Sequence, residues 1–325
     1  MDYEQLGREL VRALRGRRSQ VAFSRRLGYR TNVVYAWESG RRWPTAAILL
    51  GAVVRSRIDV RAALTQFFPN PPAWIAEIDP ASREGVAQLL AELRAKVPVV
   101  EIAKRAGRSR YAVARWLSGE AEPRVPDFLR LVQACSLRLL DFVALFVDPL
   151  TLPSAADEWR RLQAQRKAAY EMPWIPGVLR ALELRDYAAT GKHRPGWIAA
   201  RIGISPEEEA RCLEVLAQSG QIRQRAGRWV IGEALAVDTR QDATAERRLK
   251  AHWASVGMER LGAAAPGLFS FNVFTVSAAD LERLRELHRS YFRTMRSIIA
   301  SSEPSDRVVV ANVQLFALDD RTTPS

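Results

Sequence analysis

Apolar residues recur along the front of the chain at the spacing of one helical face. Leu6, Leu10, Val11 and Leu14 form the first such face. Ser19 is placed to cap a second helix that Gly28 ends, and a third helix is predicted from about Thr31 to Glu38. With two further apolar stretches before residue 68, the pattern predicts about five short helices. A helix, a tight turn at a glycine and a second short helix make a helix-turn-helix.

This pattern occurs twice, at a constant offset of 79 residues. Gly28 aligns with Gly107, and Trp37 aligns with Trp116. The agreement runs without a gap over about 65 residues and also pairs Leu10 with Leu89, Leu14 with Leu93, Val34 with Val113, Pro44 with Pro123 and Phe67 with Phe146. Such a repeat predicts two copies of one small helical domain, at residues 1–68 and 82–148, joined by a proline-rich linker at residues 69–81.

The second half of the chain is expected to hold two further modules. Within residues 155–235, Ser205-Pro206 supplies an N-cap and an N1 proline for a helix that runs to about Gln218. Residues 222–231 then have the pattern of a β-hairpin that turns at Ala226-Gly227. Helices followed by a hairpin are typical of a winged helix. The acidic run at residues 207–209 would meet phosphate, so packing or dimerisation is favoured over DNA contact for this module.

Residues 236–320 carry the clearest strand pattern of the chain. Residues 268–274 alternate between apolar and polar, and residues 307–318 supply a second apolar strand. Between them, Ser277 is placed to cap a helix from Ala278 to about Ala300. We therefore expect a small β-α-β module for dimerisation or sensing. The predicted fold class is mainly α, α+β overall: two tandem five-helix helix-turn-helix domains, a winged-helix-like module and this C-terminal module.

Charge is distributed unevenly over this plan. The 325 residues contain 49 Lys+Arg and 36 Asp+Glu, a formal net charge of +13. Residues 1–147 hold 24 of the basic and 14 of the acidic residues, a net of +10. The excess positive charge therefore belongs to the repeated helical domains. A localised excess of this kind indicates a polyanionic partner.

Several classes of protein are excluded by the same sequence. The longest apolar run, from Thr45 to Val54, is too short to span a bilayer, and we expect neither a membrane partner nor a secretory signal. Cys135 and Cys212 make neither a disulfide framework nor a zinc site. We expect both to be core thiols and the protein to be cytoplasmic.

No catalytic chemistry is indicated. The three histidines, His193, His252 and His288, have no metal-ligand spacing, and no phosphate loop, nucleophile elbow or dinucleotide-binding turn occurs. The sequence therefore predicts no enzyme, no cofactor and no metal site.

The repeat resembles a known DNA-binding family. Ser19-Gln20, Leu27-Gly28 and the run from Trp37 to Pro44 resemble the Cro/C1-type repressor DNA-binding domain. The second copy follows the same frame from Ala106-Gly107 to Pro123. The resemblance implies a helix-turn-helix whose second helix enters the major groove and meets the edges of the bases.

The side of the third helix on which each residue lies separates the expected core residues from the expected contact residues. Val34 and Trp37 are expected to face the domain core. The outward positions, where the resemblance places base contacts, are then Thr31, Asn32, Tyr35 and Ala36. Asn32 is suited to adenine. The resemblance implies that Gln20 contacts a backbone phosphate and braces the recognition helix. Phosphate contacts are expected from Arg30, Arg41 and Arg42.

The second copy differs at several of these positions. Its expected contact residues are Arg108, Arg110, Tyr111 and Arg115, with Ala114 also facing outward. Val99 replaces Gln20, while Glu120 and Glu122 replace Arg41 and Trp43. Those carboxylates are expected to face phosphate and repel it. We still predict DNA binding by this copy; the alternative is a packing or dimerisation module.

The linker sets how far apart the two copies can act. Fully extended, its thirteen residues span about 43 Å. Successive major grooves on one side of B-DNA lie about 34 Å apart. The copies are thus able to reach neighbouring grooves, unless Trp74 and Ile75 fold the linker back.

The back half, from about residue 155 to 320, is similar to a family of predicted bacterial transcriptional regulators whose C-terminal module is a domain of unknown function. The similarity is carried by Trp197-Ile198-Ala199, by Gly203-Ile204-Ser205 and by the ending from Asp306 to Leu318. It implies regulation, with no effector and no catalytic residue to transfer.

The sequence as a whole predicts a sequence-specific regulator of transcription that binds double-stranded DNA and forms a homodimer through its back half. An unknown effector, a small molecule, peptide or protein, is expected at the back half if anywhere. The alternative is a sensor or interaction protein in which DNA binding is secondary. RNA binding is disfavoured because the sequence shows no aromatic platform on a sheet.

Overall fold

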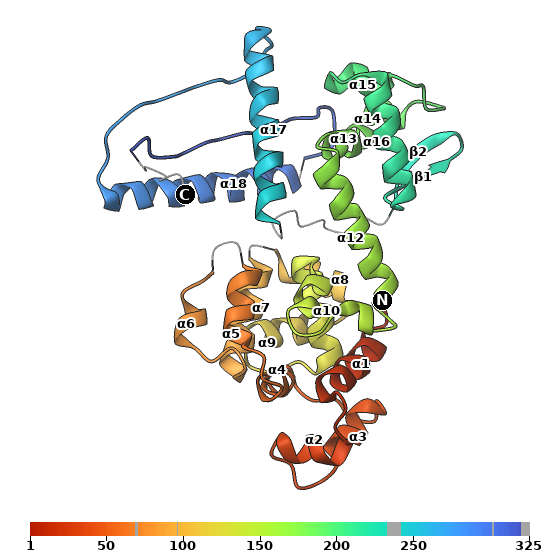
Figure 1. Cartoon of the computed structure of the whole chain (residues 1–325), viewed down its shortest axis with the longest axis vertical. Coiled ribbons are helices and arrows are strands. Elements are labelled where there is room, and N and C mark those ends of the chain that lie inside the picture. Colours follow the sequence, from red (N-terminus) through yellow and green to blue (C-terminus); the bar gives the residue numbers. More distant parts are fainter. Residues whose placement is uncertain (69–70, 96, 233–241, 301, 320–325) are drawn as a thin grey trace. The chain divides into compact units, whose positions relative to one another are not determined.

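The computed structural model describes residues 1–68, 71–95, 97–232, 242–300 and 302–319. The described chain is mainly helical with a two-stranded antiparallel hairpin, which confirms the predicted fold class (Figure 1). It divides into two compact units. Residues 1–164 form the first unit, and residues 165–232 with 242–319 form the second.

The first unit contains both copies of the repeat, and each copy has five helices. The helices of copy one are α1 (Tyr3–Arg15), α2 (Gln20–Arg26), α3 (Val33–Glu38), α4 (Ala46–Arg55) and α5 (Val60–Phe67). Those of copy two are α7 (Arg83–Arg94), α8 (Val99–Ala106), α9 (Arg110–Leu117), α10 (Val125–Ser136) and α11 (Leu139–Ala144). α2 and α8 begin 79 positions apart, as do α4 and α10, so the sequence repeat is a structural repeat.

Local signals explain where these helices begin and end. The side chains of Asp2, Ser19, Thr45 and Asp59 accept hydrogen bonds from backbone N–H groups in the first turns of α1, α2, α4 and α5. The turn after the first helix has a positive φ in both copies, 60° at Gly16 and 48° at Ala95. The repeat therefore preserves this conformation even where copy two has no glycine.

The two copies share one hydrophobic core. Phe142 of copy two lies 5.8 Å from Phe67 of copy one between ring centroids, and Phe128 and Phe146 surround it at 5.7 and 5.2 Å. All four rings meet edge to face, the arrangement that aromatic quadrupoles favour. Since this core crosses the boundary between the copies, they form one packed body.

The linker does not act as an extended tether. It contains a short helix, α6 (Trp74–Glu77), and Ile75 is buried in the shared core. Arg61 of copy one donates hydrogen bonds to the carbonyls of Ile75 and Ile78. Of the two arrangements that the sequence leaves open for the linker, the folded one is observed, because Ile75 packs into the core that the two copies share.

The second unit begins within α12 (Ala156–Glu171), which follows a 3₁₀ turn at Pro149–Thr151. Next come α13 (Ile175–Leu182), α14 (Arg185–Ala188), α15 (Trp197–Ile202), α16 (Pro206–Gln218) and the hairpin strands β1 (Ile222–Arg225) and β2 (Arg228–Ile231). Ser205 accepts a hydrogen bond from the Glu208 amide and so caps α16 as predicted. The hairpin turns at Ala226 and Gly227, both with positive φ, which confirms the predicted turn.

The last part of the second unit differs from the prediction. A long helix that the sequence pattern did not indicate, α17 (Ala243–Gly262), precedes α18 (Ala278–Ala300), which has the predicted bounds. Residues 268–274 and 307–318 are extended, but neither segment pairs as a strand with any described residue. The two predicted C-terminal strands are therefore wrong for the single chain: alternation makes a segment suitable for a sheet but does not supply its hydrogen-bond partner.

Within the described residues, no helix combines the length and the apolar content that crossing a membrane requires.

Candidate nucleic-acid interface

In copy one, α2 and α3 lie side by side at one end of the first unit (Figure 1). Ser24, which is buried, joins them: its hydroxyl donates to the Gln20 carbonyl and accepts from the Val34 amide at 3.2 Å. Gly28 closes α2 with a φ of 91°, a conformation that side-chain-bearing residues rarely adopt. These contacts fix a helix-turn-helix whose second helix is short and turned toward solvent.

The two faces of α3 are separated as the sequence predicts. Val34 and Trp37 are buried, whereas Tyr35 is 46% exposed. The helix begins at Val33, two residues later than predicted, because Asn32 is its N-cap. The Asn32 Oδ1 atom accepts from the Tyr35 amide at 3.3 Å and lies 3.3 Å from the Ser24 hydroxyl oxygen. Asn32 thus lies before the helix, at its exposed end, with its amide N–H groups free to donate.

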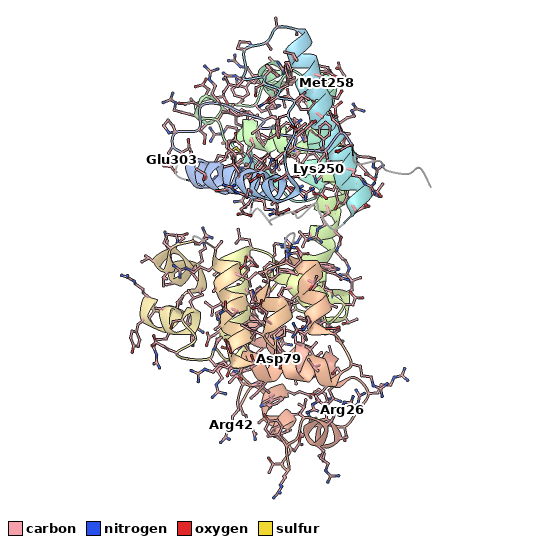
Figure 2. The ribbon with its side chains drawn as sticks, turned by 90° about the vertical axis from the view of Figure 1, so that its left-hand side faces the viewer. Arg26, Arg42, Asp79, Lys250, Met258 and Glu303 are labelled. Carbon is pink, nitrogen blue, oxygen red and sulfur yellow. The ribbon has the colours of Figure 1, made fainter. Side chains whose placement is uncertain are left out.

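The residues predicted to contact phosphate flank α3 in the sequence, at the end of the first unit that carries α2 and α3 (Figure 1). Arg30, Thr31, Arg41 and Arg42 are exposed, and Ala36 is partly buried. The side chains of Arg30 and Arg42 have neither an ion-pair nor a hydrogen-bond partner among the described residues, and the Arg41 guanidinium lies 5.3 Å from the centre of the Tyr35 ring. Figure 2 shows Arg26 and Arg42 projecting from the surface of this end. Unpaired guanidinium groups next to an exposed helix form a surface suited to phosphate.

The buried carboxylate of Glu38 supports this surface from inside the domain, a role that the sequence pattern did not indicate. Glu38, the last residue of α3, lies 2.6 Å from the Arg15 Nε atom and accepts from the Gln20 Nε2 atom at 2.7 Å. Gln20 therefore braces α3 through Glu38, and its amide is engaged inside the domain. One sequence signal would have indicated this carboxylate: it is the single acidic residue between Glu9 and Asp59, a stretch rich in arginine.

Copy two replaces the same contact with an apolar one. Val99 and Leu117 stand where copy one has Gln20 and Glu38, and Leu117 is buried. Both members of the polar pair have changed together, so neither is left without a partner. The valine at position 99 is thus explained by packing inside the domain.

The contact residues of copy two are more heavily paired than those of copy one. The Arg108 Nε atom lies 2.6 Å from Asp127, and Arg115 lies 3.7 Å from Glu120 and stacks over Tyr111. Tyr111 is 72% exposed, and Arg110 has no polar partner among the described residues. Copy two therefore presents an exposed α9 with Arg110 and Tyr111 at its start. The charges of Arg108 and Arg115 are partly neutralised by Asp127 and Glu120.

Glu122 does not face outward as expected. Its Oε1 atom accepts a hydrogen bond from the Ala47 amide of copy one at 2.7 Å, at the start of α4. A carboxylate at a helix N-terminus is stabilised by the helix dipole. The expectation that this residue repels phosphate is wrong, because it serves the contact between the copies.

The acidic start of α16 in the second unit is also partly internal. Glu209 is buried and accepts from the Ala199 amide at 2.5 Å, with the His193 Nε2 atom 3.4 Å away. Burial lowers the pKa of His193, although the nearby Glu209 carboxylate opposes this effect. The expected outward run of three carboxylates is therefore wrong at its third position.

Burial raises the pKa of the Cys135 thiol to about 11 and that of the Cys212 thiol to about 12, so both are inert core thiols.

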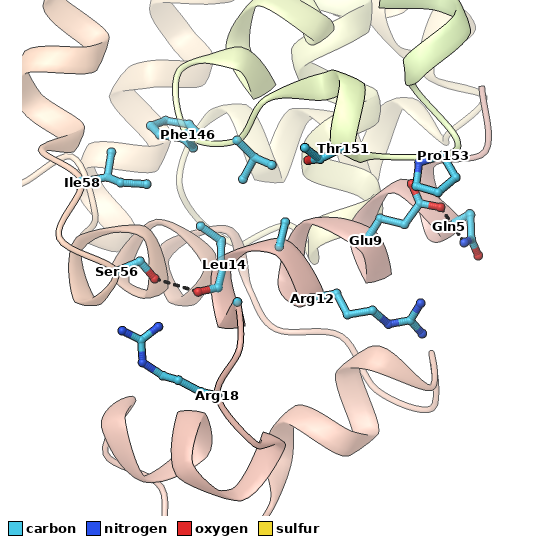
Figure 3. Close-up of a pocket in the computed structure, with 13 residues that line it drawn as sticks. Gln5, Glu9, Arg12, Leu14, Arg18, Ser56, Ile58, Phe146, Thr151 and Pro153 are labelled. Atoms are coloured by element: carbon cyan, nitrogen blue, oxygen red, sulfur yellow. Dashed lines mark hydrogen bonds between the residues drawn. The ribbon is translucent and has the colours of Figure 1, made fainter.

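A groove of about 780 Å³ lies on the first unit between α1, the end of α4 and residues 146–153 (Figure 3). Its buried carboxylate, Glu9, is already bound by Gln5 and by both the amide and the hydroxyl of Ser154. The Ser56 hydroxyl donates to the carbonyls of Leu14 and Ala52. These polar groups are satisfied within the protein, so the groove gives no indication of a ligand.

Residues 154–318, just over half of the chain, match a protein family described as a domain of unknown function, DUF4423. The protein belongs to this family. No helix-turn-helix family matches the N-terminal half. No curated protein and no solved structure matches the chain.

Proposed function

We propose that this protein is a cytoplasmic, sequence-specific regulator of transcription that binds double-stranded DNA through the two helix-turn-helix copies of its first unit. One observation carries the proposal: the same helix-turn-helix occurs twice, each time with an exposed tyrosine on its second helix and exposed arginines on that helix or in the segments beside it. The net charge of +10 on residues 1–147 supports the same partner.

The proposed roles follow from the placement of each side chain. Arg30, Arg41 and Arg42 neutralise phosphates and set the register of copy one. Asn32 and Tyr35 lie at the end of α3 that would enter the groove. Asn32 donates through its amide, since its oxygen caps the helix. In copy two, Arg110 has the free guanidinium that bidentate contact with guanine requires.

We expect the two kinds of contact to separate in binding measurements. Arg42→Ala should weaken binding to cognate and random DNA alike and reduce the slope of log K against log salt concentration by about 1.

Asn32→Ser keeps a capping oxygen but removes the amide donor, and should cost about 1–3 kcal/mol of binding free energy for cognate DNA alone. Fluorescence anisotropy at several salt concentrations measures both effects.

Arg180→Ala is the matched control, because this arginine lies in the second unit and pairs with Glu183 at 2.7 Å. It should change neither the affinity nor the salt slope. Binding to DNA that is insensitive to salt, or equal for Arg42→Ala and the unmodified protein, would contradict the proposed interface.

A further inference from the structure

The two copies meet in a reciprocal contact. The Val125 amide donates to the Pro44 carbonyl at 3.0 Å, and the Ala46 amide donates to the Pro123 carbonyl at 3.0 Å. Positions 44 and 123 are equivalent in the repeat, and so are positions 46 and 125. Between them, the equivalent residues Thr45 and Arg124 form an antiparallel bridge. Each copy therefore gives the other the same two hydrogen bonds.

The wider packing follows the same rule. α1 of copy one packs against α10 of copy two, and α7 of copy two packs against α4 of copy one. α4 and α10, which are equivalent, contact each other. When element A of one body contacts element B of the other and the converse also holds, the two bodies are related by a two-fold axis. The chain thus contains an internal pseudo-two-fold axis near Thr45 and Arg124.

This symmetry restricts how the two helix-turn-helix surfaces can act. A two-fold rotation leaves equivalent groups at the same height along its axis and inverts their direction about it, so α3 and α9 would meet a duplex that crosses this axis as an inverted pair. B-DNA has a two-fold axis of its own perpendicular to the duplex, and paired helix-turn-helix units use it to read inverted half-sites one turn apart. A pair related by translation along a tether would read direct repeats instead.

We propose that one chain of this protein binds two inverted half-sites of unlike sequence, with its two copies acting as an internal dimer. This inference rests on the proposed DNA-binding function. The half-sites differ because the surfaces differ: copy one presents Asn32 and Tyr35, whereas copy two presents Arg110 and Tyr111. A dimer of identical chains cannot have this asymmetry within a single pair of recognition helices.

Two asymmetric contacts fix the pair in place. Glu122 of copy two accepts a hydrogen bond from the Ala47 amide of copy one at 2.7 Å. The Arg124 guanidinium donates to the Trp43 carbonyl at 3.1 Å. Because the copies are joined by backbone hydrogen bonds, side chains and a shared core, the spacing of the half-sites should be fixed.

Selection of bound sites from random duplex DNA with the full chain tests this inference. The expected motif has two unlike half-sites in inverted orientation, centred about 10 base pairs apart. Insertion of a full turn, about 10 base pairs, between them should weaken binding by about 100-fold or more, because one half-site is then lost. Direct repeats, or tolerance of the inserted turn, would overturn the internal dimer while leaving DNA binding intact. If no sequence is enriched, the proposed function itself fails.

A matched pair of variants tests the interface. Glu122→Ala removes the contact with the Ala47 amide, whereas Glu120→Ala alters an exposed carboxylate of the same turn that is not in the interface. Glu122→Ala should lower the urea midpoint for unfolding of the first unit, because the Ala47 amide loses its acceptor, whereas the shared core keeps the spacing of the half-sites fixed. Glu120→Ala should leave this midpoint unchanged. Equal midpoints for both variants would show that Glu122 does not hold the pair.

A second inference rests on the end of the second unit and is independent of DNA. Residues 266–276 and 307–318 form no backbone hydrogen bond with any described residue. Most of their apolar side chains are open to solvent: Phe271 is 95% exposed and Val309 is 79% exposed, whereas Val308 packs against the core of the second unit. Extended segments with free N–H and C=O groups and alternating apolar residues are unpaired sheet edges.

α18 also exposes apolar side chains. Leu287 is 65% exposed, and Tyr291 and Ile299 are exposed as well. Some of its charges pair within the helix, Arg283 with Asp280 and Arg289 with Glu282. Exposed apolar side chains between such paired charges are suited to an apolar partner surface.

We infer that a second copy of this chain covers these surfaces and pairs with the two extended segments. A second copy supplies both partners at once: two more extended segments for strand pairing and a second α18 to pack against the first. The contact would be isologous and largely apolar, as obligate interfaces are.

The full chain should therefore sediment at twice its mass of 36.5 kDa, and the amides of residues 268–276 should be protected from hydrogen exchange in the dimer. Phe271→Asp should shift the protein to the monomer, whereas Asn272→Asp, on the opposite side of the same segment, should not. A monomer at all concentrations, with these amides exchanging freely, would overturn the inference. So would a dimer that Phe271→Asp leaves intact.

Discussion

Replacing Phe142 with alanine is expected to lower the free energy of unfolding of the first unit by about 3–5 kcal/mol. Phe142 is 2% exposed, and the rings of Phe67, Phe128 and Phe146 surround it. Alanine would leave a cavity that these rings cannot fill without losing their own contacts. Because Phe67 belongs to copy one, the change should also loosen the contact between the copies.

Tyr111→Ala is the control, since it removes an aromatic ring that is 72% exposed and should change stability by no more than about 0.5 kcal/mol. Since the chain has two compact units, unfolding in urea should be followed through amide exchange of residues in α10 and α11. A loss below 1 kcal/mol for Phe142→Ala would show that the ring cluster is not the common core of the two copies.

The second large effect is expected at Glu38. Glu38→Leu removes the acceptor of both Arg15 and Gln20 and should destabilise the first unit by about 1.5–3 kcal/mol. Copy two shows how the chain tolerates leucine here: it pairs Leu117 with Val99. The double variant Gln20→Val with Glu38→Leu should therefore be more stable than Glu38→Leu alone, by about 1 kcal/mol.

A double-mutant cycle built from Gln20→Val, Glu38→Leu and their combination measures this coupling. Arg15 keeps a partner in all variants, because its guanidinium also donates to the Arg18 carbonyl. The equivalent Arg94 of copy two donates to the Val97 carbonyl in the same way. Additive effects of the two substitutions would contradict the view that these residues are exchanged as a pair.

Local signals made much of this fold predictable. Ser205 with Pro206, and Ala226 with Gly227, act through groups a few residues away, so the start of α16 and the turn of the hairpin could be placed from sequence. The start of α3 could not, because Asn32 competes for the backbone as a cap. α17 was missed because its apolar residues do not gather on one face.

The residues of the candidate site divide in the same way, into features that local sequence predicts and features that depend on distant partners. Exposure of Tyr35 and burial of Trp37 follow from helical periodicity alone. The partners of Gln20 and Glu122 do not, since Gln20 binds Glu38 from another helix and Glu122 binds the other copy. A side chain's chemistry is visible in the sequence, whereas its partner depends on which elements pack together.

By itself, the sequence determined the repeat, its register of 79 residues, the helices of both copies and the concentration of positive charge on them, because each depends on residue type and near neighbours. Only the tertiary structure decided that the two copies pack about a pseudo-two-fold axis and that the linker is folded. Only the tertiary structure, too, left the C-terminal extended segments unpaired. The reason is physical: these features depend on contacts between residues far apart in the chain, and periodicity does not specify such contacts.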